Sequence, residues 1–186
     1  MKRLFDLFFS IILFIALIIP MMIIAVATKL TSRGPIIFWS DRIGVNNKIF
    51  RMPKFRTMII ETPSLASHLL DDPETYLSPI GSFLRSTSLD ELPQIISVLK
   101  GDMSFVGPRP ALFNQDNLIT LRTEKGVDSL IPGITGWAQV NGRDQLTIVD
   151  KVYFDEEYLF RKSFWFDIKI LGMTFFKVIK RIGVNH

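Results

Sequence analysis

The chain has 186 residues, enough for one domain with a real core, and its mean hydropathy of +0.28 is high for a protein surrounded only by water. A net charge of +4 favours anionic partners, but the basic residues are scattered and no nucleic-acid-binding motif is present, so we expect no nucleic acid partner. Cysteine is absent and the two histidines, His68 and His186, have no triad around them, so we expect any chemistry to use carboxylates.

An uncharged segment of 22 residues, Leu7 to Thr28, is long enough to reach across the apolar part of a membrane. It is longer than the apolar core of a signal peptide, which disfavours cleavage. Pro20 predicts a kink near residues 16–20, because its ring clashes with the carbonyl four residues earlier. Basic residues flank both ends, so the positive-inside rule does not separate them. Composition leaves two alternatives open, a bent re-entrant helix and a kinked span.

The next segments predict a small hairpin and then short helices. Residues 36–40 and 48–50 have the character of strands, and turn residues lie between them at 44–47. Thr62 and Ser78 each precede a proline, a pattern that predicts the first turn of a helix.

The second half alternates between helix and turn signals. The predicted elements are a helix from Pro93 to Gly101, a helix from Asn114 to Gly126, a strand at 137–140 and a tight turn at Asn141-Gly142. Thr147 and Asp150 fit a capping box, which predicts a helix over 148–161. A further helix over 164–181 is rich in aromatic and basic residues, so its apolar side either lies in a membrane interface or packs into the core.

Two adjacent carboxylates, Asp90 and Glu91, lie near a predicted helix start. Ser88 and Glu91 could form a capping box, and acids in a first turn are favoured by the helix dipole, so a purely structural role is one interpretation. Pro93 conflicts with a regular helix from Leu89, because it would stand at the fifth helical position. Neighbouring side chains on a helix point about 100° apart, so different roles for the two acids are the other interpretation.

A phosphate ligand would need cations here, because the chain has no P-loop or GxGxxG pattern. Arg109 lies between two prolines, which present its guanidinium from a stiff backbone. Its structural alternative is a salt bridge on a rigid surface loop. Lys54, Arg56, Arg85 and Arg143 are further candidates, although each is individually typical of a solvated charge.

Four ordered motifs give the chain its resemblance to a known family: KFRTM at 54–58, SLDELPQ at 88–94, LKGDMSFVGPRP at 99–110 and PGITGWAQVNGR at 132–143. Together they resemble the bacterial sugar transferases, the monotopic phosphoglycosyl transferases. The short form with one N-terminal membrane segment is most similar to the PglC-type enzymes of bacterial protein N-glycosylation. Two departures are Ile19, where a serine often precedes the kink proline, and Pro53 before the KFRTM motif.

The resemblance implies transfer of a sugar phosphate from a UDP-sugar, such as a diacetamido bacillosamine donor, to undecaprenyl phosphate with release of UMP. Asp90 would be the nucleophile that forms an aspartyl-phosphosugar intermediate, and Glu91 would assist through Mg²⁺ or as a base. Both carboxylates are therefore the expected metal ligands. By the same resemblance the substrate-binding set is expected to comprise Lys54, Arg56, Arg85, Arg109, Gln139 and Arg143.

We therefore expect a helix-rich α+β fold with short strands and interfacial amphipathic helices. Residues 1–33 would form the re-entrant membrane helix, kinked at Pro20, and residues 34–186 a cytoplasmic catalytic domain at the bacterial inner membrane. Membrane lipids and the next glycosyltransferases of the pathway are the expected further partners. Two rival functions are a metal-dependent phosphohydrolase that uses water as acceptor, and a membrane-bound scaffold in which Asp90 and Glu91 only cap a helix.

Overall fold

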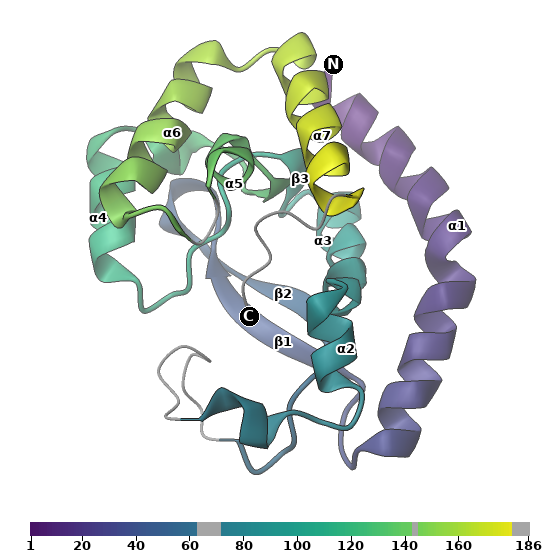
Figure 1. Cartoon of the computed structure of the whole chain (residues 1–186). Coiled ribbons are helices and arrows are strands. Elements are labelled where there is room, and N and C mark those ends of the chain that lie inside the picture. The colour runs from purple at the N-terminus through teal and green to yellow at the C-terminus, as the bar shows by residue number, and fades with distance from the viewer. Residues whose placement is uncertain (63–71, 143–144, 180–186) are drawn as a thin grey trace.

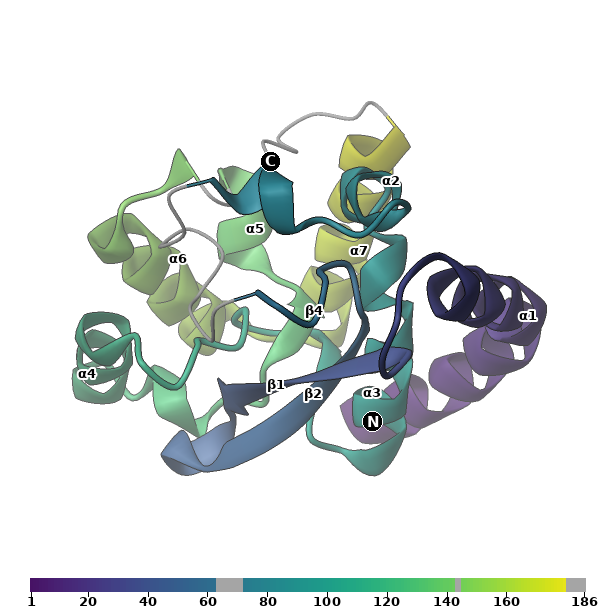
Figure 2. The same cartoon turned by 90° about the horizontal axis from the view of Figure 1, so that it is seen from below.

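The computed structural model describes residues 1–62, 72–142 and 145–179, and it shows the helix-rich α+β fold that the sequence predicts. Its first element, α1 (Lys2–Thr31), is one long helix that lies along an outer edge of the domain, as both views show (Figures 1 and 2). The described residues also form two sheets of two strands each, and Figure 2 shows the β1–β2 sheet along another edge of the domain.

The predicted hairpin is present and longer than expected. Strands β1 (Ile37–Ile43) and β2 (Ile49–Phe55) pair antiparallel from Ile37 opposite Phe55 to Ile43 opposite Ile49. The turn η1 (Val45–Asn47) is a short 3-10 segment in which Asn46 adopts the left-handed conformation. Because β2 continues past Phe50, it brings the KFRTM motif into the middle of the fold.

The segment after the hairpin differs partly from the prediction. The helix expected after Thr62 lies outside the described residues. After the 3-10 turn η3 (Pro73–Tyr76), helix α2 (Gly81–Ser86) begins three residues beyond Ser78 and has no side-chain cap. The predicted cap at Ser78 is wrong because its carbonyl, rather than its side chain, accepts the hydrogen bond from the Gly81 N–H.

The acidic pair lies on a 3-10 segment, η4 (Leu89–Gln94), which continues into helix α3 (Ile95–Lys100). Gly101 ends α3 in the left-handed conformation at φ 95°, as predicted. Strand β3 (Ser104–Val106) follows and pairs parallel with β4 (Gly133–Thr135).

Two predictions in the second half need correction. The helix expected from Asn114 is α4 (Asp116–Glu124), capped at Gln115, and it is followed by η5 (Val127–Ser129). The strand expected at 137–140 is wrong, because these residues form helix α5 (Trp137–Asn141) and the strand lies just before them in β4. Trp137, Ala138 and Val140 are all buried, which a half-buried strand with alternating faces would not allow.

The last two helices agree with the prediction over the described residues. Helix α6 (Ile148–Arg161) begins with Thr147, whose hydroxyl accepts a hydrogen bond from the Asp150 N–H. Helix α7 (Phe164–Ile179) divides its aromatic residues between two environments. Phe166 lies in the main core with Trp137 and Tyr158, whereas Trp165 is 77% exposed and Phe175 and Phe176 are similarly exposed. Core packing and an exposed apolar surface therefore coexist on one helix.

The N-terminal end of α1 is attached to the domain by polar contacts. The Lys2 ammonium lies 2.5 Å from the Asp167 carboxylate, which also accepts a hydrogen bond from the buried Tyr158 hydroxyl. Arg3 donates to the carbonyls of Val98 and Leu99 near the end of α3. These contacts hold the start of α1 beside α3 and α7, and Figure 1 shows the N-terminus next to α7.

The C-terminal end of α1 is attached to the same domain. Ile24 packs with Phe55 and Leu84, and Thr28 is fully buried. Arg56 donates to the carbonyls of Ser32 and Arg33, just beyond the end of the helix.

Between these two ends α1 is largely free of the domain. None of residues 11–23 is buried, and most of their apolar side chains are exposed. The helix passes through Pro20 without interruption and is visibly bent in Figure 1. By length and composition α1 is the one helix among the described residues that could cross a membrane. The middle of α1, residues 11–23, is therefore the part that lipid could contact.

Candidate active site

The acidic pair does not form the capping box that the sequence allows. Ser88 is in the left-handed conformation at φ 55° and its side chain makes no cap hydrogen bond. In place of the side chain, the backbone carbonyl of Ser88 accepts the hydrogen bond from the Glu91 N–H at 3.2 Å. Pro93 lies inside the 3-10 segment, and the α-helix starts after it at Ile95. Neither carboxylate therefore caps the start of a helix.

Glu91 joins two distant parts of the chain. Its Oε1 atom lies 2.6 Å from the Lys54 ammonium on β2 and 3.2 Å from the Arg109 guanidinium. Burial alone would raise the pKa of Glu91, but the charges and hydrogen bonds of Arg109 and Lys54 hold that pKa far below its usual range. Glu91 is therefore ionised at neutral pH.

Asp90 has a different environment from its neighbour. Its side chain is almost buried, at 11% exposure, and it forms a long ion pair with Lys54 at 3.9 Å. Burial is the main cause that raises the pKa of Asp90, and Lys54 and Arg85 partly oppose it by their positive charges. One carboxylate is thus fixed in an ion pair, whereas the other is desolvated and more weakly held.

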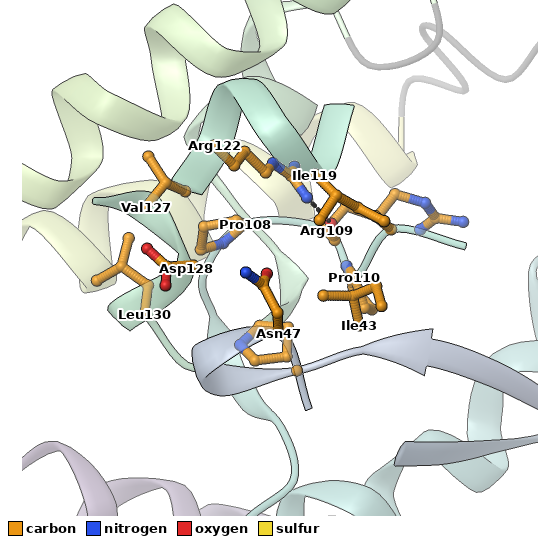
Figure 3. A pocket seen from close by; sticks show the side chains of 13 residues that line it. Ile43, Asn47, Pro108, Arg109, Pro110, Ile119, Arg122, Val127, Asp128 and Leu130 are labelled. Carbon is orange, nitrogen blue, oxygen red and sulfur yellow. Dashed lines mark hydrogen bonds between the residues drawn. The ribbon is translucent and has the colours of Figure 1, made fainter. Parts of the chain in front are cut away.

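The backbone of the Pro108-Arg109-Pro110 segment is held in place by a residue of helix α4. Arg122 on α4 donates to the backbone carbonyl of Arg109 and forms a 2.6 Å ion pair with the buried Asp155. Figure 3 shows this hydrogen bond and the Arg109 side chain pointing away from Asp128 and Leu130. Arg109 therefore reaches Glu91 from a backbone that has little freedom.

Three glycines let the strands approach closely behind this segment. A Cβ atom at Gly107, Gly133 or Gly136 would overlap backbone atoms of the neighbouring segment. At Gly136 the overlap would be with the Gly107 carbonyl and also with Gln139 Oε1, only 2.6 Å away. The close approach of β3 and β4 thereby sets the position of Gln139 relative to Arg109.

The structure brings several predicted residues together and separates one from them. Lys54, Arg85 and Arg109 lie around the acidic pair, and Gln139 lines an adjoining groove that Arg109 also lines. Arg56 is almost buried and its guanidinium binds the carbonyls of the two residues after α1, so in this structure it holds the end of α1 rather than the acidic pair. Arg143 lies outside the described residues.

The adjoining groove contains a residue that sequence reasoning missed, Arg42. Its guanidinium donates to the Ser40 hydroxyl and the Pro110 carbonyl. Burial and the nearby Arg109 charge lower the pKa of Arg42 to about 10, and Glu91 partly opposes this. A basic residue at the end of a hairpin strand is usually solvated, so no local signal distinguishes Arg42 in the sequence.

A second hollow lies on the other side of the Arg109 backbone, between the hairpin turn and the start of η5 (Figure 3). Its space, counted together with open solvent, is about 350 Å³, and its lining includes Asn47, Asp128 and Leu130. Neither Asp90 nor Glu91 lines this hollow or the adjoining groove, but Gln139 lines the groove alone. We place the candidate active site at the acidic pair and extend it to the groove through Arg109 and Gln139.

The acidic pair has the donor atoms for a divalent cation. Asp90 and Glu91 provide carboxylate oxygens, and no cluster of three or more acidic or histidine side chains suited to a metal occurs among the described residues. Mg²⁺ commonly binds through one or two carboxylates, with water and substrate phosphates as its other ligands. The residues present therefore fit Mg²⁺ better than an ion that needs a complete protein cage.

Comparison with known proteins identifies the family to which the chain belongs. The family model described as bacterial sugar transferase matches residues 1–181, so the chain belongs to the bacterial sugar transferase family. The match confirms the predicted family and the predicted class of enzyme, a transferase.

Individual relatives narrow the comparison. The chain is 40% identical over 188 residues to the uncharacterized sugar transferase EpsL of Bacillus subtilis, covering all of this chain and 91% of EpsL. It is 41% identical to the undecaprenyl-phosphate glucose phosphotransferase of Komagataeibacter xylinus and 44% identical to the UDP-glucose:undecaprenyl-phosphate glucose-1-phosphate transferase of Escherichia coli. These matches cover 93% and 83% of this chain but only 35% of each longer relative.

We expect Gly136→Ala to lower the free energy of unfolding by about 1–3 kcal/mol, because the new methyl group overlaps backbone that cannot move freely. Gly172→Ala on α7 is the matched control. Nothing lies within 4 Å of its Cβ position, so the loss of glycine freedom in a helix should raise stability by up to about 1 kcal/mol. Denaturant unfolding in detergent measures both, and equal stability of the two variants would contradict the packing argument.

Proposed function

We propose that the protein transfers a sugar phosphate from a UDP-sugar to undecaprenyl phosphate and releases UMP, with Asp90 as the nucleophile. The observation that carries this proposal is the contrast between two adjacent carboxylates. Glu91 forms ion pairs with both Lys54 and Arg109. Asp90 is desolvated, and its contact with Lys54 is longer. The names of the relatives, two of which specify transfer to undecaprenyl phosphate, support the same reaction.

In the first step an Asp90 oxygen attacks the β-phosphorus of the donor. The new bond joins this oxygen to phosphorus, and the bond from phosphorus to the bridging oxygen breaks, so UMP leaves with the bonding electrons. Lys54, Arg85 and Arg109 offset the negative charge that would otherwise keep a carboxylate away from a diphosphate. The product of this step is an aspartyl-phosphosugar.

In the second step a phosphate oxygen of the lipid attacks the same phosphorus and Asp90 leaves as a carboxylate. Because the lipid phosphate replaces the aspartate, the product is a polyprenyl diphosphate sugar and the enzyme returns to its starting state. Water in place of the lipid would give the rival hydrolysis, so the acceptor must be presented where the intermediate forms.

Mg²⁺ is the cofactor that we propose, held by Asp90 and Glu91. When bound, it would add positive charge next to the donor phosphates. Lys54 and Arg109 hold Glu91 in a fixed position for this role, whereas Arg85 lies on the Asp90 side.

Two observations favour different sugars for the transferred group. Relatives are named for glucose and galactose transfer. The similarity to short enzymes of protein glycosylation favours a diacetamido bacillosamine-like sugar instead. Incubation with a panel of UDP-sugars, followed by extraction of lipid-linked product, would identify the donor.

We propose that α1 enters one leaflet of the bacterial inner membrane and returns, with the catalytic domain in the cytoplasm. Both ends of α1 bind the same domain, through Lys2 with Asp167 at one end and Arg56 with the Arg33 carbonyl at the other. A helix that crossed the bilayer could not keep both contacts, because its ends would lie in different compartments. The exposed Trp165 and Phe176 on α7 would lie in the same interface.

Asp90→Asn is expected to abolish UMP release and adduct formation while leaving the fold intact, because the amide has the same shape but is not a nucleophile. Intact-protein mass spectrometry after incubation with a UDP-sugar alone would show the added phosphosugar on the unaltered protein and none on the variant. Asp102→Asn, a loop substitution outside the site, is the control and should form the adduct. Turnover by Asp90→Asn at the normal rate would show that another group is the nucleophile, whereas the absence of both UMP release and adduct on the unaltered protein would favour the scaffold.

The pH dependence of the first step should follow Asp90, which must be ionised to attack. Burial raises the pKa of Asp90 and Lys54 opposes this, so removal of the lysine charge should raise that pKa further. We therefore expect Lys54→Gln to move the acid limb of single-turnover UMP release to higher pH. Lys48→Gln, at an exposed position of the same hairpin, should leave the limb in place. A shift to lower pH would contradict the assignment.

Single-cysteine labelling tests the membrane geometry without interference, because the chain has no cysteine of its own. Cysteines inserted after Met1 and substituted at Arg33 should react with an impermeant reagent from the same side of sealed vesicles. Glu124→Cys marks the side of the catalytic domain and should label with them. Labelling of the two helix ends from opposite sides would show a membrane-spanning α1.

A further inference from the structure

The groove beside the acidic pair is lined by basic side chains without any acidic one. The groove is open to solvent, and its empty space together with that solvent is about 570 Å³. The four cations that line it are Arg42, Arg109, Arg122 and Lys151. Such a surface has a positive potential that only an anionic ligand would neutralise.

Two of these cations have a carboxylate partner and two do not. Arg109 pairs with Glu91, and Arg122 pairs with Asp155. Within the described part of the chain neither Arg42 nor Lys151 forms an ion pair. Arg42 is partly buried, and its two hydrogen bonds, to the Ser40 hydroxyl and the Pro110 carbonyl, orient the guanidinium without neutralising it. A partly buried cation in this state is suited to receive its counter-charge from a ligand.

Gln139 adds a second kind of recognition to the same groove. Its Oε1 atom is buried and has no hydrogen-bond partner, while its Nε2 atom donates to the Ile134 carbonyl at 3.3 Å. A buried acceptor without a partner is costly unless a ligand supplies an N–H or O–H group. Uracil and ribose both carry such groups. Ala138 and Leu118 contribute apolar surface against which a flat ring could pack.

Arg109 connects the groove to the acidic pair, because its side chain binds Glu91 and also lines the groove. The two phosphates of a UDP-sugar share one bridging oxygen. An α-phosphate next to Arg109 in the groove would therefore leave the β-phosphate on the side of Asp90. The sugar would lie beyond the β-phosphate, away from the groove.

We infer that this groove is the subsite for the UMP half of the donor, in which Arg42 and Lys151 bind the α-phosphate and Gln139 accepts a hydrogen bond from the nucleoside. The inference rests on the proposed function for the identity of the donor. It assigns Arg42 and Lys151 as substrate-binding residues in addition to those expected from the motifs. Inorganic phosphate and the phosphate of the acceptor lipid carry similar charge, so the test must separate them from UMP.

The experiment measures UMP binding to the full-length protein in detergent by calorimetry, without turnover. Arg42→Gln should weaken UMP binding about tenfold or more, as expected when a charge-assisted hydrogen bond is lost. Lys151→Gln and Gln139→Leu should each weaken it by a smaller factor. Arg51→Gln is the matched control, since it removes the same charge from an exposed position on the same hairpin, where Arg51 lies over the Trp39 ring. It should leave UMP affinity unchanged.

Farnesyl phosphate and inorganic phosphate form the comparison arms. Support for the UMP subsite is a loss of UMP affinity in Arg42→Gln with unchanged affinity for farnesyl phosphate. Loss of farnesyl phosphate binding alone would assign the groove to the acceptor, and phosphate binding as tight as that of UMP would reduce it to a general anion site. Either result overturns the inference, as does unchanged UMP affinity in Arg42→Gln and Lys151→Gln with normal thermal unfolding.

Failure of this inference can be distinguished from failure of the proposed function. If no adduct forms on the unaltered protein but UMP binding depends on Arg42, the covalent mechanism is wrong and the subsite stands. If the adduct forms and UMP binding ignores Arg42, the subsite is wrong and the mechanism stands.

Discussion

The contact of Glu91 with both Lys54 and Arg109 is the interaction on which the site depends. It joins the end of a hairpin strand, a 3-10 turn and a proline-bounded loop, which are far apart in the sequence. Removal of Glu91 would leave two partly buried cations without their shared carboxylate, which is more costly than the net value of the intact cluster. The same contact gives the neighbouring Asp90 its distinct character, because Glu91 takes the close contact with Lys54 and leaves Asp90 the longer one.

Helix α1 and the candidate active site contact the same strand. Strand β2 ends with Lys54 at the acidic pair and Phe55 against α1, and the next residue, Arg56, binds the carbonyls after that helix. A change in the position of α1 would thus be transmitted directly to the strand that carries Lys54.

Much of the fold and part of the site could be predicted from the sequence, and the failures have identifiable causes. The hairpin, α6 and the end of α3 follow from local signals that act within a few residues, such as the cap at Thr147 and the left-handed Gly101. The segment at 137–140 was misassigned because its apolar residues fit a strand locally, whereas the strand position is taken by 133–135 through pairing with β3.

The roles of the basic residues depended on contacts that no local pattern contains. Arg56 and Lys54 are two residues apart in one motif, yet Arg56 binds the carbonyls just beyond α1 and Lys54 binds the acidic pair. Arg42 reaches the groove only because β1 and β2 pair in one register and the Pro110 carbonyl lies opposite. Ser88 and Glu91 have the residue types and spacing of a capping box. The left-handed backbone at Ser88 and the positive charges facing Glu91 prevent that box from forming.

The charge balance of the site bears on what it can bind. Lys54, Arg42, Arg85 and Arg109 surround Asp90 and Glu91, which leaves two positive charges in excess. Burial acts on both kinds of group in opposite directions, since it raises the pKa of Asp90 and lowers that of Arg42. A diphosphate diester carries two negative charges, so its binding would neutralise the excess cations. It would also disfavour ionised Asp90 by repulsion, and a divalent cation between the carboxylates and the phosphates is the simplest means of offsetting that cost. The excess of basic residues and the expected requirement for Mg²⁺ are therefore consequences of the same need, which is to bring a carboxylate nucleophile to an anionic substrate.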